Sequence, residues 1–400
     1  MTVYIKPSVA RGEIIAPPSK SVLHRALICA ALSGCSEVDN VIFNDDIKAT
    51  IAGLSLLGAD IKLGTNKVTA GGFMPEKCVN KEIDCNESGS TLRFLIPLAM
   101  YSGSKIVFSG SERLFSRDLS VYREIAKEQG LEFTERKNSV KVCGKLKSGV
   151  FKMRGDISSQ FVSGLMFVLP LLDGDSKIEF TTKIESQPYI DLTVKVLSEF
   201  GIVIKSQKNG YYVSGNQIYK NKKITAEGDY SNAAFLEAFN LLGGKVKVKG
   251  LKDDTVQGDR VYKDYFKNVK SGGIFSLKDC PDLAPILFAL AAEFSGAHFT
   301  GTARLKIKES DRANAMKEEL SKLGAEILVY DDDVIIKGTK LHAPELPICS
   351  HNDHRIVMAL SVLLSKYGGI IEGAEAVNKS YPQFFTDIKG LGIEVKTDDN

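Results

Sequence analysis

A structural unit repeats along this chain about every 70 residues, and the repeat constrains the fold more than any other feature. The first half of each copy combines a polar turn, an apolar helix, a glycine near the helix end and a short strand. Copies of this half lie at 18–38, 89–106, 158–178, 231–246, 282–299 and 353–371. Glycine adopts a left-handed conformation at little cost, so we expect helix caps at Gly34, Gly103, Gly174, Gly243, Gly296 and Gly368.

The second half of the unit is a helix that ends in glycine, followed by a β-hairpin. Alternating apolar residues and turns rich in Asn or Asp predict hairpins at 57–71, 129–144, 200–215 and 323–338. A copy near 269–274 is degraded, and the copy at 391–395 is cut short by the C-terminus. The unit is a βαβαββ-like module of an α/β protein. We expect three modules in each of two domains, with a boundary in the polar stretch 216–227, because one module cannot bury both of its helices.

The composition fits a soluble globular protein. The 400 residues are 44% hydrophobic and 25% charged, and they are too many for one ordinary core. The net charge of +3 argues against a nucleic-acid-binding surface, which would need clustered basic residues. The start of the chain shows no signal-peptide pattern, and no stretch approaches the roughly 20 apolar residues of a membrane helix. Seven scattered cysteines without a Cys-x-x-Cys motif predict reduced thiols in a cytoplasmic protein.

Several polar or basic turns stand just ahead of apolar, helix-like stretches. They are Lys20-Ser21 with Arg25, Glu87 to Arg93, Ser158-Ser159-Gln160, Ser186 to Tyr189, Asp282, Lys308 to Arg312, and His351 to Arg355. The first turn of a helix has free N–H donors and a positive dipole end, so such turns can bind small anions. Several in one chain indicate substrates that carry phosphate and carboxylate. Each turn alone fits a capped, solvated helix end about as well, and Lys20 lacks the glycines of a P-loop.

Some of these residues allow two interpretations. Asp282 stands between two prolines and fits either a helix N-cap or, beside bound anions and arginines, a general base held ionised by its neighbours. Lys308 and Arg312 would share one face of a helix, although such runs often form surface charge clusters. His351 and His354 could suggest a metal site, but their separation of three and the lack of a third ligand argue against it, so no metal is predicted.

In their order along the chain, these motifs resemble the EPSP synthase (3-phosphoshikimate 1-carboxyvinyltransferase) family. The matching pieces are Pro-Ser-Lys-Ser-x3-Arg, Gly-Ser-Thr-x-Arg, Ser-Ser-Gln-Phe, Gln-Pro-Tyr-Ile-Asp, Pro-Asp, Lys-Glu-Ser-Asp-Arg, Asn-Asp-His-Arg and Lys-Ser-Tyr-Pro, from residue 17 to 382. The family's fold has two domains of three βαβαββ units each (an inside-out α/β barrel), which agrees with the repeat. The resemblance implies transfer of the enolpyruvyl group of phosphoenolpyruvate to the 5-hydroxyl of shikimate 3-phosphate, with release of phosphate. This reaction belongs to the shikimate pathway to chorismate and aromatic amino acids, and the family is the target of glyphosate.

The resemblance also implies roles for individual residues. The residues implied to bind shikimate 3-phosphate are Ser21, Arg25, Ser158, Ser159, Ser186, Tyr189, Asp282 and Lys308. Those implied to bind or border phosphoenolpyruvate are Lys20, Gly89, Arg117, Gln160, Arg312, Arg355 and Lys379. Asp282 is expected to take the proton of the hydroxyl, while Glu309 and Lys20 are candidates for the proton relay at C3 of phosphoenolpyruvate.

The expected domains are an N-terminal one at 14–225, mainly on the shikimate 3-phosphate side, and a C-terminal one that combines 1–13 with 226–400 and completes the phosphoenolpyruvate site. The domains are expected to close on the ligands. No metal or organic cofactor is required. We expect a cytoplasmic monomer that acts on these two small substrates and binds neither nucleic acid nor membrane.

The chain departs from the family pattern in two places. The family usually has Asn two residues before the glycine of the second motif, whereas this chain has Glu87 there and Asn86 one residue earlier. Pro commonly follows the arginine at position 117, but this chain has Asp118. Either substitution could shift the local turn beside the expected phosphoenolpyruvate site.

Two other functions fit part of the pattern. A sister enolpyruvyl transferase acts on UDP-N-acetylglucosamine but typically carries a reactive Cys just before the arginine equivalent to Arg117, and segment 111–118 has none. A non-catalytic anion-binding repeat protein would gain nothing from acids such as Asp282 and Glu309 among so many cations.

Overall fold

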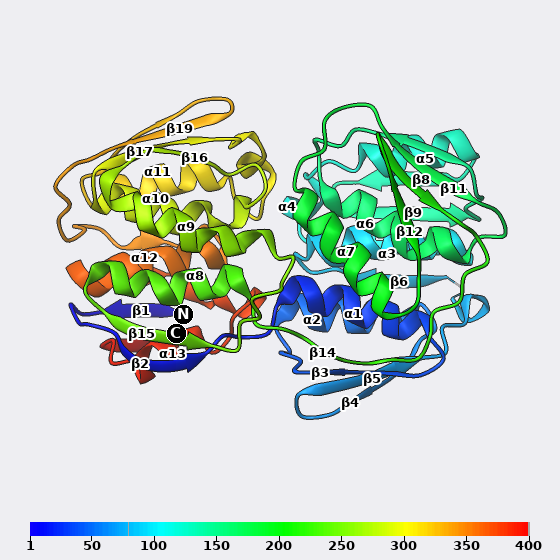
Figure 1. Ribbon diagram of the computed structural model, residues 1–400, viewed down its shortest axis with the longest axis horizontal. Coiled ribbons are helices and arrows are strands. Elements are labelled where there is room, and N and C mark those ends of the chain that lie inside the picture. Colours follow the sequence, from blue (N-terminus) through cyan, green and yellow to red (C-terminus); the bar gives the residue numbers. More distant parts are fainter. Residues whose placement is uncertain (79, 399–400) are drawn as a thin grey trace. The chain divides into compact units, whose positions relative to one another are not determined.

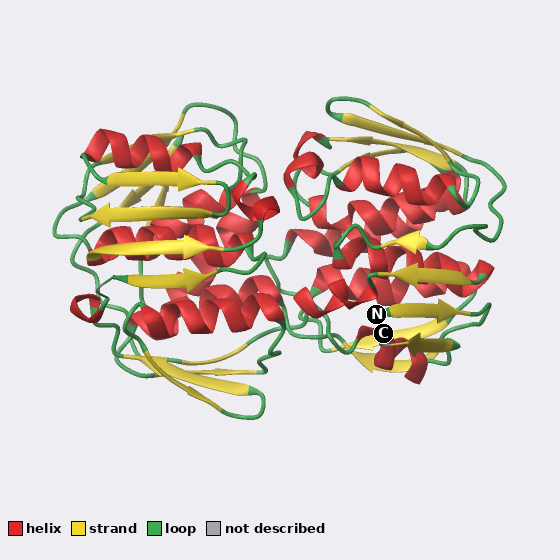
Figure 2. Cartoon of the chain, turned by 180° about the vertical axis from the view of Figure 1, so that it is seen from behind, coloured by secondary structure: helices red, strands yellow, loops and turns green. Residues whose placement is uncertain are grey.

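The computed structural model describes residues 1–78 and 80–398, and the chain forms two compact units. The central unit is Pro18–Glu227, and the terminal unit combines Met1–Pro17 with Gly228–Asn400. Each unit contains helices packed against several small sheets (Figures 1 and 2).

Each module of the central unit supplies a buried first helix, a second helix and a sheet. The first helices are α1 (Lys20–Leu32), α3 (Gly89–Ser102) and α6 (Ser159–Val168); the others are α2 (Asp45–Leu56), α4 (Glu112–Phe115), α5 (Ser120–Gln129) and α7 (Gln187–Glu199). The first sheet has the order β14 (Lys223–Thr225), β3 (Ser36–Asp39), β5 (Lys67–Gly71), β4 (Asp60–Leu63). The second has the order β6 (Lys81–Asp84), β7 (Gly103–Ser109), β9 (Ser139–Gly144), β8 (Glu132–Arg136). The third has the order β10 (Val150–Met153), β11 (Ser176–Phe180), β13 (Gly210–Val213), β12 (Ile204–Gln207).

The terminal unit follows the same plan. Its first helices are α8 (Tyr230–Ala238), α10 (Ala284–Glu293) and α12 (His354–Tyr367); its second helices are α9 (Tyr262–Asn268), α11 (Arg312–Ser321) and α13 (Phe384–Gly390). One sheet has the order β16 (Ile274–Ser276), β17 (Gly296–Thr300), β19 (Asp333–Lys337), β18 (Glu326–Val329). Another has the order β20 (Ile348–Cys349), β21 (Gly369–Glu372), β1 (Thr2–Ile5), β22 (Val395–Asp398), and the last pairs β15 (Lys245–Lys249) with β2 (Arg11–Ile15).

Short 3₁₀ helices connect these elements. They are η1 (Pro75–Lys77), η2 (Leu169–Leu171), η3 (Phe239–Leu242), η4 (Gly258–Val261), η5 (Val269–Ser271), η6 (Pro281–Leu283), η7 (Ala303–Ile307) and η8 (Ala374–Lys379). In each four-stranded sheet the first two strands are parallel and the remaining pairs are antiparallel. This is the pattern of a strand, a crossover helix and a hairpin, so the predicted α/β fold of repeated modules is confirmed.

Strands from one module also complete the sheets of another. β2 precedes α1 in sequence but pairs in parallel with β15 of the terminal unit. β14 precedes α8 but pairs in parallel with β3 of the central unit. The truncated copy at 391–395 is completed by β1, which lies between β21 and β22. The chain therefore places its first 17 residues with the terminal unit.

The copy near 269–274 is degraded in the structure, as its sequence indicates. Where the other modules have a hairpin, this region forms α9 and η5 and then continues directly into β16 of the next sheet. In the described part of the chain, β15 has β2 as its one strand partner.

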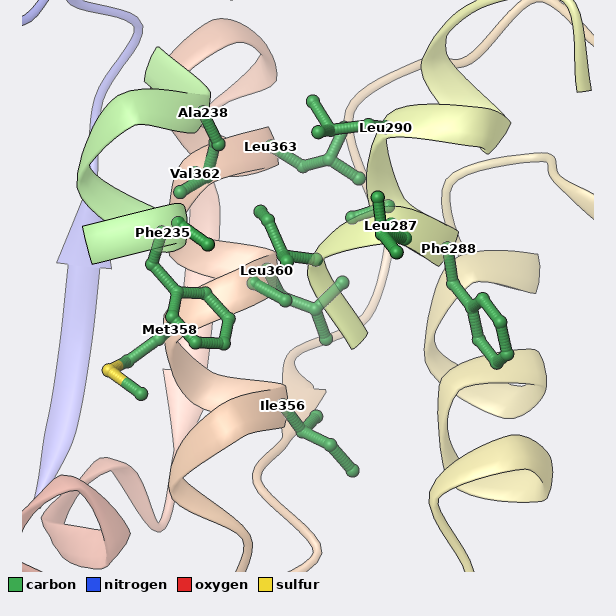
Figure 3. Close-up of a cluster of buried hydrophobic side chains, with 14 of the residues drawn as sticks. Phe235, Ala238, Leu287, Phe288, Leu290, Ile356, Met358, Leu360, Val362 and Leu363 are labelled. Atoms are coloured by element: carbon green, nitrogen blue, oxygen red, sulfur yellow. The ribbon is translucent and has the colours of Figure 1, made fainter. Parts of the chain in front are cut away.

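The first helices are apolar on nearly all sides, so each must be enclosed by other elements. In α12, every residue from His354 to Ser365 is buried. Figure 3 shows Met358 and Leu360 of α12 facing Phe235 of α8 and Leu287 of α10. Because the helix bodies are fixed in a packed core, the polar first turns at their N-termini are held rigidly.

The prediction of glycine caps is confirmed in part. Gly103, Gly243 and Gly368 occupy cap positions and have positive φ angles. The prediction is wrong for Gly34, Gly174 and Gly296, because Ser33 is the C-cap of α1, α6 continues into η2, and Phe294 is the C-cap of α10. Gly296 is required for a different reason, since an added Cβ would lie 2.4 Å from the Ile336 carbonyl oxygen on the neighbouring strand.

Across the described residues, none of the helices combines the length and the apolar character that crossing a membrane requires.

Candidate active site

In the central unit, serine hydroxyls cap the N-termini of the first helices. Ser19 accepts from the N–H of Val22 at 3.5 Å, Ser88 from that of Thr91 at 3.1 Å, and Ser158 from that of Gln160 at 3.3 Å. A hydroxyl satisfies one free N–H but adds no negative charge. The positive ends of α1, α3 and α6 are therefore available to an anion.

Arg25, on α1, is buried and bound by neutral groups. Its Nε donates to the Thr193 hydroxyl at 2.8 Å, and its terminal nitrogens donate to the carbonyls of Ser21 at 2.8 Å and Tyr189 at 3.0 Å. The guanidinium also lies over the Phe94 ring, 5.2 Å from its centroid. Burial lowers the pKa of Arg25 to about 10, so the group is still charged at neutral pH. Its charge is thus fixed in place without a neutralising carboxylate among these partners.

A second cationic group gathers at the start of α3. Arg93 donates to the Gln160 side chain at 3.2 Å and to the Asp118 carbonyl at 3.2 Å. Gln160 in turn donates to the Ser90 hydroxyl at 3.0 Å. A Cβ added to Gly89 would lie 2.9 Å from a terminal nitrogen of each of Arg93 and Arg117. Glycine at this position therefore leaves the room in which two guanidinium groups meet a helix N-terminus.

The remaining predicted residues of the central unit lie in α1 and α7. Lys20 forms an ion pair with Asp46 of α2 at 2.7 Å, and each side chain is 13% exposed. Ser186 is buried and has a φ of 56°, a left-handed conformation that is uncommon for a residue other than glycine. It is the N-cap residue just before α7, and its carbonyl accepts from the N–H of Tyr189 at 3.1 Å. Strained backbone of this kind is often found at ligand sites.

In the terminal unit, Asp282 is the centre of an ionic cluster. One of its oxygens accepts from Arg312 at 2.8 Å and lies 3.6 Å from the Lys308 ammonium. Its other oxygen accepts from Arg355 at 2.8 Å. Burial alone would raise the pKa of Asp282, but the charges of Arg355, Lys308 and Arg312 outweigh it and hold the pKa well below the ordinary value. Asp282 is therefore an ionised carboxylate rather than a simple helix cap.

Arg312 joins three carboxylates. Besides Asp282, its Nε donates to Asp353 at 2.8 Å and a terminal nitrogen donates to Glu309 at 2.6 Å. Its side chain is 1% exposed. Burial opposes its charge, but Asp353, Glu309 and Asp282 more than compensate and raise its pKa. The planar guanidinium suits this because it offers several donors in fixed directions.

The other cations of the terminal unit complete the cluster. Arg355 donates to the Ser231 hydroxyl of α8, and its backbone N–H donates to Asp353 at 3.0 Å. Burial lowers the pKa of Lys308 to about 8, against the attraction of Asp282. Lys379, at the end of η8, donates to the carbonyl of Asn352.

The structure thus brings together the residues that were predicted within each unit. In the terminal unit, Asp282, Lys308, Glu309, Arg312 and Arg355 share direct contacts, and Lys379 holds the loop before Asp353. In the central unit they form a group around Arg25 with Ser21 and Tyr189, and a group around Gly89 with Arg117 and Gln160. Lys20, Ser158 and Ser159 stand at the helix starts beside these groups.

Several residues of the site were not predicted. Arg93 and Asp353 stand inside the motifs Gly-Ser-Thr-x-Arg and Asn-Asp-His-Arg, so their position was a usable signal. Asp46 pairs with Lys20 from another helix, and Ser231 binds Arg355 from another module. Their partners are distant in sequence, so spacing alone could not reveal them.

The two departures from the family pattern fit the local structure. Asn86 takes a φ of 53°, and Ser88 caps α3, so Glu87 stands in the turn before the helix. The Asp118 carboxylate accepts from the N–H of Ser120 at 2.7 Å at the start of α5, while its carbonyl binds Arg93. The Asp118 carboxylate therefore holds Ser120, the first residue of α5, from the loop before the helix, where proline would only stiffen the backbone.

One cluster has the composition of a metal site. The side chains of Glu318, Glu319 and His351 bring ligand atoms within 4.8 Å of one another. One Glu319 oxygen already accepts from the Lys322 ammonium at 2.8 Å and the Cys349 N–H at 2.9 Å. The pairing of His351 with His354 considered from sequence is not part of this cluster. The other Glu319 oxygen contacts Nε2 of His351 at 2.8 Å, so both oxygens of this carboxylate already take part in hydrogen bonds within the protein.

Comparison with known proteins identifies the family. The family model described as EPSP synthase (3-phosphoshikimate 1-carboxyvinyltransferase) matches residues 5–270 and 263–388. The chain is 43% identical to the 3-phosphoshikimate 1-carboxyvinyltransferase of Clostridium kluyveri over 417 aligned residues, covering 98% of each chain. The enzyme of that name from Clostridium acetobutylicum is 42% identical, again over 98% of each chain. The chain belongs to the EPSP synthase family.

Solved structures show the same fold. The EPSP synthase of Acinetobacter baumannii superposes with a TM-score of 0.79 at 22% identity, covering 99% of this chain and 100% of the other. The enolpyruvyl transferase NikO from Streptomyces tendae gives a TM-score of 0.75 at 13% identity, covering 99% and 98%. The predicted resemblance to the EPSP synthase family is therefore confirmed over nearly the whole chain.

Proposed function

We propose that this protein transfers the enolpyruvyl group of phosphoenolpyruvate to the 5-hydroxyl of shikimate 3-phosphate, releasing phosphate, as 3-phosphoshikimate 1-carboxyvinyltransferases do. One observation of the site carries the proposal beyond family membership. Asp282 is an ionised carboxylate held among Arg312, Arg355 and Lys308. A site that only binds anions gains nothing from a buried carboxylate. A carboxylate that can accept a proton, placed beside anion-binding cations, suits addition of a hydroxyl to phosphoenolpyruvate.

Shikimate 3-phosphate is assigned mainly to the central unit. A phosphate dianion is well matched by the uncompensated charge of Arg25 and by the hydroxyls at the start of α6. The proposed ligands are Ser21, Arg25, Ser158, Ser159, Ser186 and Tyr189, with Asp282 and Lys308 from the terminal unit. Arg25 is held by carbonyls of both Ser21 and Tyr189, which supports their assignment to one ligand.

Phosphoenolpyruvate carries a carboxylate and a phosphate, so it needs several fixed cations. The proposed ligands are Lys20, Gly89, Arg117 and Gln160 in the central unit and Arg312, Arg355 and Lys379 in the terminal unit. The space at Gly89 beside two guanidinium groups supports one part of this assignment. The shared contacts of Arg312 and Arg355 with Asp282 support the other.

In the addition step the hydroxyl loses a proton, its oxygen bonds to C2 of phosphoenolpyruvate, and C3 gains a proton. In the elimination step C3 loses a proton and the C2–O bond to phosphate breaks, which gives the enol ether product and free phosphate. Asp282 is the proposed base. Both of its oxygens are engaged by arginines, which makes it a weak base. Substrate anions that draw on Arg312 and Arg355 would weaken this hold and raise the pKa of Asp282 toward a useful range.

The proton for C3 is assigned to Glu309 or Lys20. Glu309 is ion-paired with Arg312, and Lys20 is ion-paired with Asp46, so each is held in a defined position. Glu309→Gln and Lys20→Met separate these alternatives. At saturating phosphoenolpyruvate, the variant of the relay residue loses proton exchange at C3, which mass spectrometry of phosphoenolpyruvate in deuterated water measures.

We also propose that the protein is a cytoplasmic monomer that needs no metal or organic cofactor and binds neither nucleic acid nor membrane. All seven cysteines lie in the described part of the chain and are free thiols, which suits a reducing compartment. Light scattering coupled to size exclusion measures the mass directly, and a dimer mass would contradict the proposal.

The test of function is phosphate release by the purified protein with phosphoenolpyruvate and shikimate 3-phosphate, without added metal. A parallel reaction replaces shikimate 3-phosphate by UDP-N-acetylglucosamine. Release with shikimate 3-phosphate alone is expected. Release with the nucleotide sugar alone would assign the sister activity, and release with neither would contradict an enolpyruvyl transferase.

A further inference from the structure

The loop between β20 and α12 has an unusual backbone. His351 and Asn352 are consecutive residues with φ angles of 47° and 53°. Residues other than glycine rarely take this left-handed conformation, because the Cβ atom crowds the backbone. Such a conformation persists where surrounding contacts enforce it.

This strained loop orients cations of the proposed phosphoenolpyruvate site. The carbonyl of Asn352 accepts from the Lys379 ammonium. The next residue, Asp353, is fully buried and accepts from Arg312 Nε at 2.8 Å and from the backbone N–H of Arg355 at 3.0 Å. A change in the backbone at 351–352 would therefore move the acceptors of the Lys379 ammonium, the Arg312 guanidinium and the Arg355 backbone N–H.

Glu319 holds this loop from α11. It is fully buried and lies about two turns beyond Arg312, on the same face of the helix. Its Oε1 contacts Nε2 of His351 at 2.8 Å, and its Oε2 accepts from the backbone N–H of Cys349 at 2.9 Å. α11 thus contacts the loop at two places. Glu319 binds Cys349 and His351, and Arg312 binds Asp353 after the strained residues.

The charges around Glu319 stabilise its contacts with the loop. Burial would raise the pKa of Glu319, but hydrogen bonds from His351, Lys322 and the Cys349 N–H lower it, so the group is ionised. The hydrogen bond to Glu319 raises the pKa of His351. Lys322 also donates to the Pro347 carbonyl at 3.0 Å, which ties the strand before the loop to the same carboxylate. Glu318 is farther, 3.9 Å from the imidazole.

We propose that Glu319 and His351 are positioning residues for phosphoenolpyruvate binding, which enforce the left-handed backbone at 351–352 and so place Lys379, Arg312 and Arg355. The inference rests on the proposed function. Neither residue is expected to touch the substrate; both act through the Asn352 carbonyl and the Asp353 carboxylate.

The test compares His351→Ala with His351→Gln, which retains an N–H donor toward Glu319. For His351→Ala, KM for phosphoenolpyruvate should rise on the order of tenfold or more, because small displacements of binding groups have large effects. KM for shikimate 3-phosphate should change less than about twofold, since its proposed ligands lie mainly elsewhere. His351→Gln should restore most of the affinity. Glu319→Gln should resemble His351→Ala.

A second readout does not depend on turnover. Labelling of Lys379 by acetic anhydride, followed by mass spectrometry, should be several-fold faster in His351→Ala than in the wild type, because the Asn352 carbonyl no longer holds the amine. His298→Ala is the matched control. His298 makes a similar contact with Asp333, at 2.7 Å, on the sheet that contains β17 and β19, and its loss should leave KM and labelling unchanged.

Inactivity of the wild type with both acceptors would contradict the proposed function, while the labelling result would still test the inference. Unchanged labelling together with unchanged KM for phosphoenolpyruvate would overturn the inference. Equal increases in both KM values would also overturn it, because they would indicate a general loss of structure. Loss of wild-type turnover on chelation, restored by a divalent cation, would instead assign Glu318, Glu319 and His351 to a metal.

Discussion

Arg25 in the central unit and Arg312 in the terminal unit are both buried, yet their partners differ in kind. Arg25 donates to a hydroxyl and two carbonyls, whereas Arg312 donates to the carboxylates of Asp282, Glu309 and Asp353. The helix caps show the same division, with Ser19, Ser88 and Ser158 in the central unit, and Asp229 and Asp353 in the terminal unit.

This difference indicates that the two units contribute differently to binding and to proton transfer. A buried cation held by neutral groups retains its attraction for an anion, which suits binding of a phosphate ester. A cation held by carboxylates is fixed accurately but already neutralised, and the acids beside it can accept or donate protons. We therefore expect changes in the terminal unit to affect turnover and stability most, and changes in the central unit to affect binding.

The largest effect is expected for Asp282→Asn. The amide keeps the shape of the carboxylate but cannot take the proton of the hydroxyl. Turnover should fall by about a hundredfold to ten-thousandfold, while shikimate 3-phosphate still binds. Rapid-quench measurement of phosphate release, with calorimetry of binding on the same protein, checks both. Near-normal turnover would exclude Asp282 as the base.

Stability should differ between two matched arginine deletions. Arg312→Ala leaves three carboxylates of a buried cluster without their shared cation, so it should cost about 3–5 kcal/mol of unfolding free energy. Arg25→Ala leaves neutral acceptors without a donor and should cost about 1–3 kcal/mol. Urea unfolding of both variants measures the difference. Equal costs would remove the contrast between the two units.

Gly89→Ala tests the crowded end of α3. The added methyl would lie 2.9 Å from two guanidinium groups, which must shift. Such overpacking costs about 1–3 kcal/mol, which corresponds to roughly fivefold to 150-fold if all of it is lost from binding. We expect weaker phosphoenolpyruvate binding and weaker inhibition by glyphosate, which should compete with phosphoenolpyruvate. Inhibition constants at several phosphoenolpyruvate concentrations check this, and unchanged inhibition would show that Gly89 is misassigned.

The smallest effect is a pH dependence through Lys308. Its pKa is lowered to about 8, so the ammonium is charged below that pH and loses its charge as the pH rises through it. KM for shikimate 3-phosphate should therefore rise between pH 7 and 9, by at most about tenfold. In Lys308→Arg this rise should be absent, because guanidinium keeps its charge. The same rise in both proteins would assign it to another group.

Much of the architecture could be predicted from sequence. The period of the polar turns and apolar helices predicts the modules, because a helix that is apolar all round must be enclosed. The exchange of β2 and β14 could not be predicted, since a strand that precedes α1 or α8 gives no sign of the sheet it joins. The prediction of glycine caps was wrong where the helix ended early or continued as a 3₁₀ turn, because residue propensities do not determine where a helix ends.

The candidate site could also be predicted only in part. Lys308 and Arg312 could be located from their motif, and both contact Asp282. The expectation that they share one face of a helix is wrong, because Lys308 is extended and α11 begins at Arg312. The contacts that give them their properties come from other elements: Asp353 for Arg312, Asp46 for Lys20 and Thr193 for Arg25. Whether carboxylates neutralise a buried cation therefore depends on contacts between elements that are distant in sequence, and only the structure shows these contacts.

Calorimetric titration of shikimate 3-phosphate, in the absence of phosphoenolpyruvate, tests this division most directly. The matched variants are Arg25→Lys and Arg355→Lys, which keep the charge but lose the planar arrangement of donors. Arg25→Lys should weaken binding by roughly tenfold or more, while Arg355→Lys should stay within about threefold of the wild type. The reverse order would show that the terminal unit holds shikimate 3-phosphate and would contradict the account.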